Sequence, residues 1–220
     1  MPLILGTNSI KDTGFDVANS LRFNSGSSDS LSRTLSGGDR QKMTFSCWVK
    51  RSSNGGTQNV MVFWTDANNN FLIRFVDSGA LDIESLVSGA YAGNNKTTRL
   101  FRDVSAWYHI VIRVDTTNGT AGDRIRIYIN NTEEISFSDS SNPNSSANLN
   151  INTNGQTLYV GRTNGGSYFN GYMAEVVLID GQALDPTSFG EFDEDSGIWK
   201  PKNVSGLTFG TNGFYLDFED

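Results

Sequence analysis

"WYHIVIRVDTTNGTAGDRIRIYIN", residues 107–130, decides the fold class. In its first half the apolar side chains alternate with a period of two, so the even-numbered residues from Tyr108 to Val114 share one face of a predicted strand. The second half repeats the pattern with isoleucine at 125, 127 and 129. The Thr, Asn and Gly residues between the halves favour a turn. The segment is therefore predicted to form an antiparallel hairpin with one buried face.

The same alternation recurs along the chain. "MTFSCWVK" (43–50) places Met43 and Cys47 on one face and Trp48 on the other. Polar clusters such as "SDSSNPNSSANLN" (138–150) separate the runs and are predicted to be turns. Only "DPTSFGEF" (185–192) looks helical, with Asp185 as the predicted cap. Further strands are predicted at 20–23, 59–64, 71–76, 80–86, 157–162, 171–180 and 213–218, which together indicate an all-β, two-sheet antiparallel sandwich.

The strand "GYMAEVVLID" (171–180) carries an acid among apolar residues. Strict alternation places Glu175 on the same face as Met173 and Val177. A carboxylate on such a face needs a partner or an open edge of the sheet. Asp180 and Gly181 are predicted to form a turn after this strand.

Composition excludes several classes of function. The net charge of −7 among 220 residues argues against a nucleic-acid partner or an anionic membrane, because both need clustered Lys and Arg. No apolar stretch has the length of a membrane span, so no membrane insertion is expected. The single cysteine, Cys47, cannot form an intramolecular disulfide. No signal peptide is visible, so a role outside the cell requires release by lysis or in a particle.

Several motifs resemble one known group of proteins in the same order along the chain. These are "SLRFNSGSSDSLSRT", "FSCWVK", "WYHIVIRVD", "RIRIYINN" and "LYVGRTNGGSYFNGYMAEVVLIDGQALDPTSF". They are similar to strands of the laminin-G-like and pentraxin-like branch of the concanavalin A-like lectin/glucanase jelly rolls. The resemblance covers about residues 20–192 and implies a jelly-roll sandwich.

The two ends of the chain read "MPLILGTNSIKDTGFDVANSLRFN" (1–24) and "SGIWKPKNVSGLTFGTNGFYLDFED" (196–220). Both resemble jelly-roll structural proteins of tailed bacteriophages, especially those of marine bacteria. That resemblance implies a virion component, such as a fibre, spike or capsid-surface module, made in the host cytoplasm and released by lysis. The implied partners are other virion proteins, further copies of this chain and host cell-surface glycans. Residues 1–18 are predicted to be an arm that docks on a neighbouring subunit, residues 19–192 the domain, and residues 193–220 a connector with a final strand.

Catalysis is the alternative to these structural roles. Glucanases of this fold use two carboxylates on alternate residues of a strand, and "EFDED" (191–195) matches those letters. It lies after the closing strand in a polar context, so a solvated turn is expected. His109 and Cys47 share no recognisable catalytic motif, and His109 is predicted to be a structural strand residue. The protein is therefore predicted not to be an enzyme, with a glycoside hydrolase as an alternative.

Calcium is the alternative to a cofactor-free protein. Pentraxin-like relatives hold calcium with acids and amides from two loops, and "TDANNN" (65–70) offers one such loop. The second loop, "GRTNGGSYFN" (161–170), contains no carboxylate, although calcium prefers several oxygen ligands. No cofactor is therefore predicted.

Glycan binding needs an aromatic face for stacking and amide or carboxylate groups for hydroxyls. Trp64, Trp107 and the Asn residues could instead be packed strand residues and turn formers. A free carbohydrate-binding lectin remains an alternative to a virion module. The predicted glycan-binding residues are Trp64, Asp66, Asn69, Asn70, Tyr91 and Tyr168.

Overall fold

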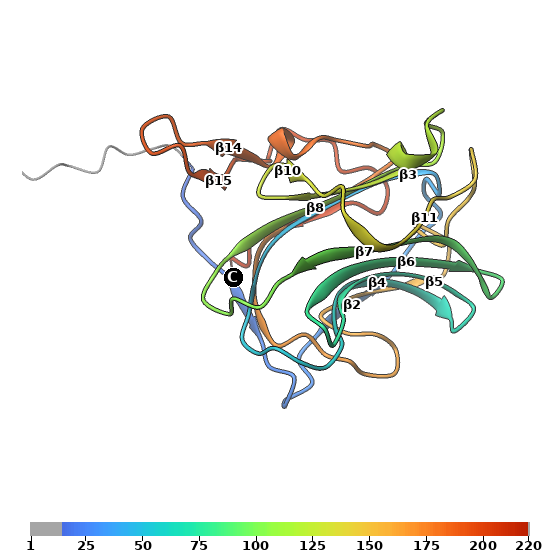
Figure 1. Ribbon diagram of the computed structural model, residues 1–220, viewed down its shortest axis with the longest axis horizontal. Coiled ribbons are helices and arrows are strands. Elements are labelled where there is room, and N and C mark those ends of the chain that lie inside the picture. Colours follow the sequence, from blue (N-terminus) through green and yellow to red (C-terminus); the bar gives the residue numbers. More distant parts are fainter. Residues whose placement is uncertain (1–14, 220) are drawn as a thin grey trace, which may run out of the picture.

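Two antiparallel β-sheets lie face to face in the computed structural model, which describes residues 15–219 (Figure 1). The predicted all-β sandwich is confirmed. Helical structure in the described part consists of two 3-10 turns, η1 (Ala121–Asp123) and η2 (Pro186–Ser188). No helix within residues 15–219 is long and apolar enough to cross a membrane.

The first sheet has seven strands, and its central strands are the most strongly alternating segments of the sequence. In spatial order its strands are β1 (Leu21–Phe23), β13 (Gly171–Asp180), β3 (Lys42–Arg51), β8 (Tyr108–Asp115), β9 (Ile125–Ile129) and β10 (Thr132–Glu133). The seventh strand, β16 (Phe214–Leu216), also pairs with β13.

The second sheet also has seven strands. In spatial order these are β11 (Phe137–Ser141), β7 (Ala90–Leu100), β6 (Ala80–Val87), β5 (Asn69–Phe75), β4 (Gln58–Asp66), β12 (Thr157–Val160) and β2 (Leu31–Thr34). A separate hairpin pairs β14 (Gly190–Phe192) with β15 (Trp199–Pro201).

The hairpin predicted from residues 107–130 is confirmed as β8 and β9. Ile112 lies opposite Ile127, and Val114 lies opposite Ile125. All four side chains are buried between the sheets, where they join Met43 and the alternate residues of β3. Burying a large apolar side chain contributes roughly 1.5–3 kcal/mol, so this shared face supplies much of the stability of the sandwich.

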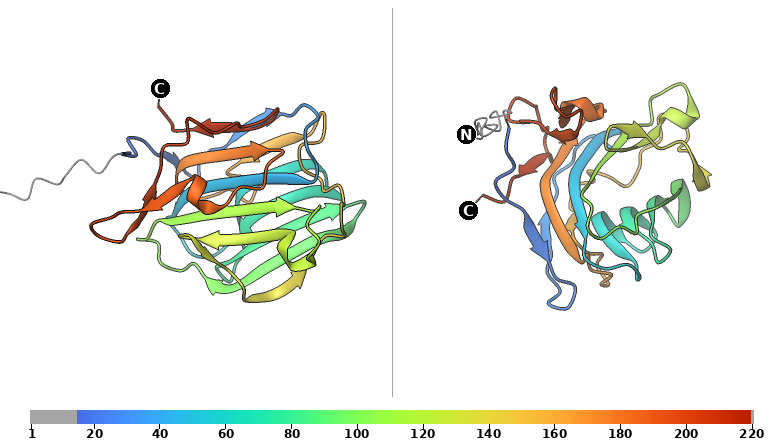
Figure 2. Two further views of the ribbon diagram at one scale, coloured as in Figure 1. Left: turned by 90° about the horizontal axis from the view of Figure 1, so that it is seen from above. Right: turned by 60° about the vertical axis from the view of Figure 1, so that its left-hand side comes forward.

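The outer face of the first sheet, which points away from the second sheet, is partly covered by the C-terminal part of the chain. In Figures 1 and 2 the orange-to-red segment lies on this face. Phe189 and Val204 pack there against Val111 and Val177. The segment expected to be a connector contains the turn between β14 and β15, and its last strand, β16, pairs with β13.

Met173 lies in the core between the sheets and Val177 lies on the outer face, so the alternation predicted for this strand is wrong. The pairing of β13 with β3 shifts between Ala174 and Val177, and Glu175 has a φ of +51°. This β-bulge inserts one residue, after which the odd-numbered residues point outward. The predicted need for a partner is confirmed, because the Tyr215 hydroxyl donates to Glu175 Oε2 at 2.6 Å. Burial raises the pKa of Glu175.

Two other local predictions are also wrong. Asp185 occupies the N-cap position of η2 but makes no capping hydrogen bond with its side chain. Its carboxylate lies 3.4 Å from Arg113 Nη1, so the ion pair replaces the cap. Residues 138–141, predicted to be a turn, belong to β11, because their backbone pairs with Asn94–Lys96 of β7.

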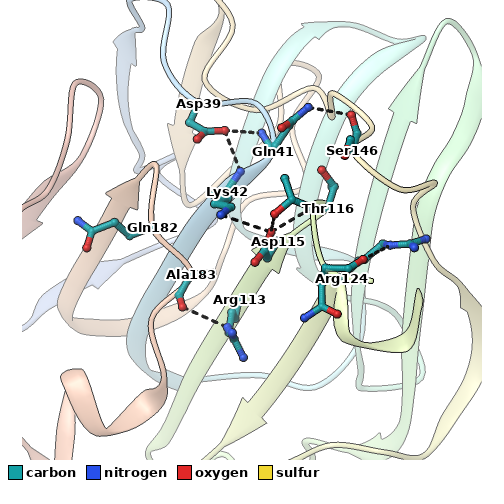
Figure 3. A network of polar contacts seen from close by, with 12 residues as sticks. Asp39, Gln41, Lys42, Arg113, Asp115, Thr116, Arg124, Ser146, Gln182 and Ala183 are labelled. Atoms are coloured by element: carbon teal, nitrogen blue, oxygen red, sulfur yellow. Dashed lines mark hydrogen bonds and ion pairs between the residues drawn. The ribbon is translucent and has the colours of Figure 1, made fainter. Parts of the chain in front are cut away.

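Polar contacts fasten the loops at the end of the first sheet where β3 begins and β8 ends (Figure 3). Asp39 Oδ1 accepts hydrogen bonds from the backbone N–H groups of Gln41 and Lys42, at 2.7 and 3.0 Å. Gln41 Nε2 donates to the carbonyl of Ser146 at 2.8 Å. Lys42 Nζ lies 4.0 Å from Asp115 Oδ1. These acids are occupied by contacts within the chain, which indicates a structural role for the cluster.

Candidate functional site

The outer face of the second sheet, turned away from the first sheet, carries rows of charged and amide side chains. Because Phe71 and Ile73 point into the core, the alternate residues Leu72 and Arg74 point outward. Strand register then sets the outward residues side by side. One row across β5, β6, β7 and β11 contains Arg74, Asp82, Lys96 and Asp139, and the next contains Leu72, Glu84 and Asn94.

Arg74 joins two carboxylates on neighbouring strand β6. Its Nε donates to Asp82 Oδ2 at 2.9 Å, and its Nη2 donates to Glu84 Oε2 at 2.7 Å. The side chain of Asp82 is only 2% exposed, so this is an ion pair largely removed from solvent. A depression of about 330 Å³ opens beside it, lined by Asp82, Lys96 and Asp77 among others.

Four buried oxygen atoms on this face accept no hydrogen bond. Buried polar atoms are paired in at least nine cases out of ten, so four such atoms on one face form an unusual group. The orientation of each amide is fixed by the acceptor that its nitrogen finds. Asn59 Nδ2 donates to the carbonyl of Ser167, and Asn94 Nδ2 donates to Asp139. Asn70 Nδ2 donates to backbone carbonyls of the β4–β5 turn. The four atoms are Asn59 Oδ1, Asn70 Oδ1, Asp82 Oδ1 and Asn94 Oδ1. All four are acceptors that lie just beneath the surface, so a ligand rich in hydroxyl or amine donors would complement them once these side chains shift to meet it.

An aromatic border lies beside these acceptors, on β4, β12 and the loop that follows β12. Trp64 packs against the cluster of Val62, Leu72 and Tyr159. The Arg162 guanidinium lies 4.6 Å from the centre of the Tyr159 ring. Arg162 also lies 5.9 Å from the ring centre of Tyr168. The Tyr159 hydroxyl donates to Asn164 Oδ1 at 3.0 Å. Aromatic faces next to hydrogen-bonding groups form the combination that carbohydrate sites use.

The residues predicted to bind a glycan all border this face. Trp64 lies opposite Asn70, and Leu86 of β6 lies opposite both Asn70 and Tyr91. Trp64, Asn70 and Tyr91 therefore stand in one row across the sheet. Tyr91 is 63% exposed, whereas Asn70 is buried with only its oxygen unpaired. Tyr168 lies apart from that row and reaches the face through Arg162, which donates to its hydroxyl at 3.4 Å.

Asp66 and Asn69 form the turn at the end of this row. The Asp66 carboxylate accepts the N–H of Asn68 at 2.7 Å and the amide of Asn69 at 3.1 Å. The turn therefore uses its only carboxylate to hold its own conformation. Nowhere in residues 15–219 do three acid, His or Cys side chains gather as metal ligands would. The donor set does not fit the two-loop calcium site of the pentraxin-like relatives.

His109 and Cys47 point to opposite faces of the first sheet. Trp199 Nε1 donates to His109 Nδ1 at 2.9 Å, and because indole is only a donor, the proton of the neutral ring is on Nε2, which lies 2.8 Å from Ser46 Oγ. Burial lowers the pKa of His109 to about 3. Cys47 faces the core, where burial raises its pKa. The two side chains serve packing.

In "EFDED" the acids lie on the β14–β15 hairpin. The Ser196 backbone N–H and hydroxyl, together with Lys200, lower the pKa of Asp193 to about 2. Glu191 lies 3.9 Å from Lys200 Nζ and is exposed. The segment comprises the end of β14 and a solvated, ion-paired turn, so the turn expected there begins after Phe192.

The charged residues of the outer face were missed by reasoning from the sequence. Asp82 and Glu84 alternate inside the strand "ALDIESL", and Arg74 interrupts "FLIRFV" in the same way. Charges on every second residue of a strand predict a polar outer face. That signal was present, whereas the contact between Arg74 and both acids depends on the pairing of β5 with β6.

Comparisons with known proteins agree on the fold. Residues 15–188 match the family described as the concanavalin A-like lectin/glucanases superfamily. No match was found among curated proteins. A SAP-like pentraxin from Limulus polyphemus, described as heptameric, is similar with a TM-score of 0.58 and 15% identity over 93% of this chain and 94% of that chain.

Two further structures are similar over parts of longer chains. Mouse laminin alpha1 domains LG4-5 give a TM-score of 0.55 and 14% identity over 94% of this chain and 50% of that chain. The enzymatically active domain of tailspike protein 2 from bacteriophage CBA120 gives 0.57 and 14%, over 91% of this chain and 30% of that chain. At such identities the similarity shows the fold. The lectin-like jelly roll described above belongs to the concanavalin A-like lectin/glucanases superfamily.

Proposed function

We propose that this chain is a non-enzymatic structural module of a phage particle that binds host-surface glycans on the outer face of its second sheet. The observation that carries the glycan part is the set of four buried acceptors without partners, beside an aromatic border. Each hydroxyl of a sugar can donate one hydrogen bond, and its ring can stack on an exposed aromatic side chain.

Acceptors dominate the recognition groups of this face, so the ligand is a polyhydroxyl chain and not a phosphorylated one. The acids Asp66, Asp77, Asp82, Glu84 and Asp139 outnumber the basic groups Arg74, Lys96 and Arg162, and two of the acids already engage Arg74. An anionic sugar would meet this negative charge directly. Neutral or amine-bearing glycans are the class that fits best.

The virion role rests on different support. The phage-like ends of the sequence and the similarity to the CBA120 tailspike domain both favour a particle protein. The partners in this role are other virion proteins and further copies of the chain. A free lectin is the rival, and mass spectrometry of purified particles separates the two. Peptides of this chain at a fixed ratio to the capsid protein support the virion role, and their absence excludes it.

One observation favours a glycoside hydrolase as a second candidate. Asp82 and Glu84 occupy alternate positions of one strand on an open face, an arrangement that glycosidases of this fold use. Retaining chemistry needs one carboxyl group to deliver a proton and the other to attack. Because Arg74 donates to both, the pair is better suited to holding a ligand than to proton transfer. Hydrolysis of a bound glycan that is lost in Glu84→Gln would favour the enzyme.

Glycan binding is tested with the full chain on a glycan array, followed by calorimetry with the best ligand. Tyr91→Ala removes an exposed ring, and Asn94→Ser removes an unpaired acceptor. Each should weaken binding by roughly 10–100-fold, the equivalent of about 1–3 kcal/mol. Tyr172→Ala, on the first sheet and 37% exposed, is the matched control and should change affinity less than about twofold. Equal effects of all three variants, or no binding by the wild type, would contradict the proposed site.

A further inference from the structure

The dipeptide Asn-Gly occurs six times in this chain, and it has a chemistry of its own. The backbone nitrogen of the glycine can attack the side-chain carbonyl carbon of the asparagine, because glycine has no Cβ to block the approach. A bond forms between that nitrogen and that carbon, and the side-chain nitrogen leaves as ammonia. Water then opens the resulting cyclic imide, which leaves aspartate or isoaspartate, whose backbone runs through the former side chain.

All six pairs lie in the described part of the chain. The predicted docking arm, of which residues 1–14 lie outside that part, contains no such pair. The hydrogen bonds around each pair can therefore be compared. A pair reacts only when its side-chain carbonyl and the following nitrogen are free to approach each other, so bonds to either group protect it.

Two asparagines are held by both ends of the side-chain amide. Asn212 is fully buried, and its amide bonds to the backbone carbonyl and N–H of Ser36, at 2.8 and 2.9 Å. Asn170 accepts from Arg22 at 3.0 Å and donates to Ser53 at 3.1 Å. These bonds must break before either side chain can turn toward the following nitrogen.

Two further asparagines are restrained in surface turns. Asn118 Oδ1 accepts the N–H of Thr120 at 2.9 Å, and Arg124 Nε donates to the Asn118 backbone carbonyl at 2.9 Å. Asn164 Oδ1 accepts from the Tyr159 hydroxyl at 3.0 Å. The N–H of the glycine after Asn164 donates to a threonine hydroxyl at 3.2 Å. In both turns the reaction would again have to break two hydrogen bonds.

The remaining two pairs are closely matched, because both are exposed and both glycines have a positive φ, +99° at Gly55 and +77° at Gly155. They differ at the attacking nitrogen. The Gly155 N–H donates to the Leu35 carbonyl at 3.0 Å. Within residues 15–219, neither the Gly55 N–H nor the Asn54 backbone carbonyl takes part in a hydrogen bond. The peptide group between Asn54 and Gly55 can therefore rotate without breaking one.

The single contact of the Asn54 side chain is compatible with the reaction. Asn54 Nδ2 donates to the backbone carbonyl of Arg102 at 2.7 Å. This nitrogen is the one that the reaction expels. The Arg102 carbonyl can accept a hydrogen bond from the amide and also from the protonated amine that forms before ammonia leaves.

We propose that Asn54 is a site of spontaneous deamidation, whereas the fold protects the other Asn-Gly pairs. Each hydrogen bond that must break first should slow the reaction by roughly 2–10-fold, so Asn154 should react several-fold more slowly than Asn54. The pairs held by two bonds should react slower still. The inference depends neither on glycan binding nor on a place in a virion.

The product would loosen the turn between β3 and β4. Gln58 is 3% exposed and fastens this turn, because its Nε2 donates to the carbonyls of Ser53 and Gly55 at 3.2 and 3.3 Å. Isoaspartate lengthens the backbone between these two carbonyls by one carbon atom, which disturbs both bonds. The new carboxylate can only accept hydrogen bonds, so the bond to the Arg102 carbonyl is also lost.

The test incubates the folded full chain at neutral and at mildly alkaline pH and follows the six pairs by mass spectrometry of its peptides. Asn54 should convert first, and faster at the higher pH, because the Gly55 nitrogen attacks after losing its proton. Asn154 is the matched control within the same molecule. In a chain kept unfolded in urea all six pairs should convert at similar rates, since no fold protects them.

Asn54→Gln tests the structural consequence. Glutamine can still donate to the Arg102 carbonyl, but its longer side chain closes a larger ring and reacts more slowly. The urea concentration at the midpoint of unfolding should fall in the incubated wild type in proportion to the converted fraction. The incubated variant should keep its midpoint.

Three results would overturn the inference. An Asn54 amide that stays intact in the folded chain excludes the site. Equal rates at Asn54 and Asn154 in the folded chain exclude the selection by hydrogen bonds. Conversion of Asn54 with an unchanged midpoint of unfolding excludes the loosening of the turn.

Discussion

Acidification from about pH 7.5 to about pH 5 should destabilise the native state by about 2 kcal/mol through one side chain, His109. Burial lowers its pKa in the folded protein from 6.5 to about 3. Between these two values the unfolded chain binds a proton that the native state does not bind. The contribution of His109 to the free energy of unfolding is therefore complete above about pH 6.5 and decreases as the pH falls toward about 3.

The magnitude follows from the two pKa values. At about pH 5 the unfolded histidine lies about 1.5 units below its pKa, and each unit corresponds to about 1.36 kcal/mol. The structural cause is specific. Nδ1 of His109 accepts from Trp199, so a proton there removes the bond that fastens the β14–β15 hairpin to the first sheet.

Urea denaturation at both pH values, for the wild type and His109→Gln, measures this contribution. A glutamine side chain can accept from Trp199 and donate to Ser46, but it does not titrate. Glu175, whose pKa burial raises, changes stability in the opposite direction on acidification, but it is present in both proteins and cancels. The variant should lose about 2 kcal/mol less than the wild type. Equal losses in the two proteins would refute the assignment to His109.

Three further changes test the fold. Tyr215→Phe removes the donor to Glu175, so the pKa of Glu175 should rise further in an NMR titration and stability at neutral pH should fall by about 1–3 kcal/mol. In Gly210→Ala, at φ +82°, the added Cβ would lie 2.2 Å from the backbone oxygen of Asp180, so the melting temperature should fall strongly. In Gly155→Ala, at φ +77°, the added Cβ meets no other atom, so the cost should be only about 1 kcal/mol. Cys47 should react with a thiol reagent only after unfolding, because it is buried and burial raises its pKa.

Strands with one continuous apolar face could be predicted from the sequence. In β3, β8 and β9 every second residue faces the core, so the two-residue period of apolar side chains in the sequence matches the set of core residues in the structure. β7 was missed because its inward residues include Gly93, Asn95 and Thr97, which carry no apolar signal. Pairing with β6 and β11 on both sides determines that strand, and no local pattern reports such pairing.

The site was predictable in its composition and not in its geometry. Trp64 and Tyr91 are aromatic residues beside Asn-rich turns, which predicts a place in a glycan site, and strand register brings both to the outer face of the second sheet. The unpaired oxygens of Asn59 and Asn94 depend on where each amide nitrogen finds its acceptor. Those acceptors lie 108 and 45 residues away along the chain, beyond the range of local patterns.

β1 and β16 both pair with β13, end to end along one edge. Leu21 lies opposite Met173, and Leu216 lies opposite Val176. The chain therefore joins and leaves the first sheet within three residues of the same strand, on either side of the bulge at Glu175. A short linker between Asp217 and Ser20 could close the backbone there, and new termini could open at the exposed Gly55–Gly56 turn between β3 and β4. Such a circular permutant would retain every strand pairing while moving both ends to the turn that follows β3, a rearrangement that protein engineers could use to redirect fused cargo.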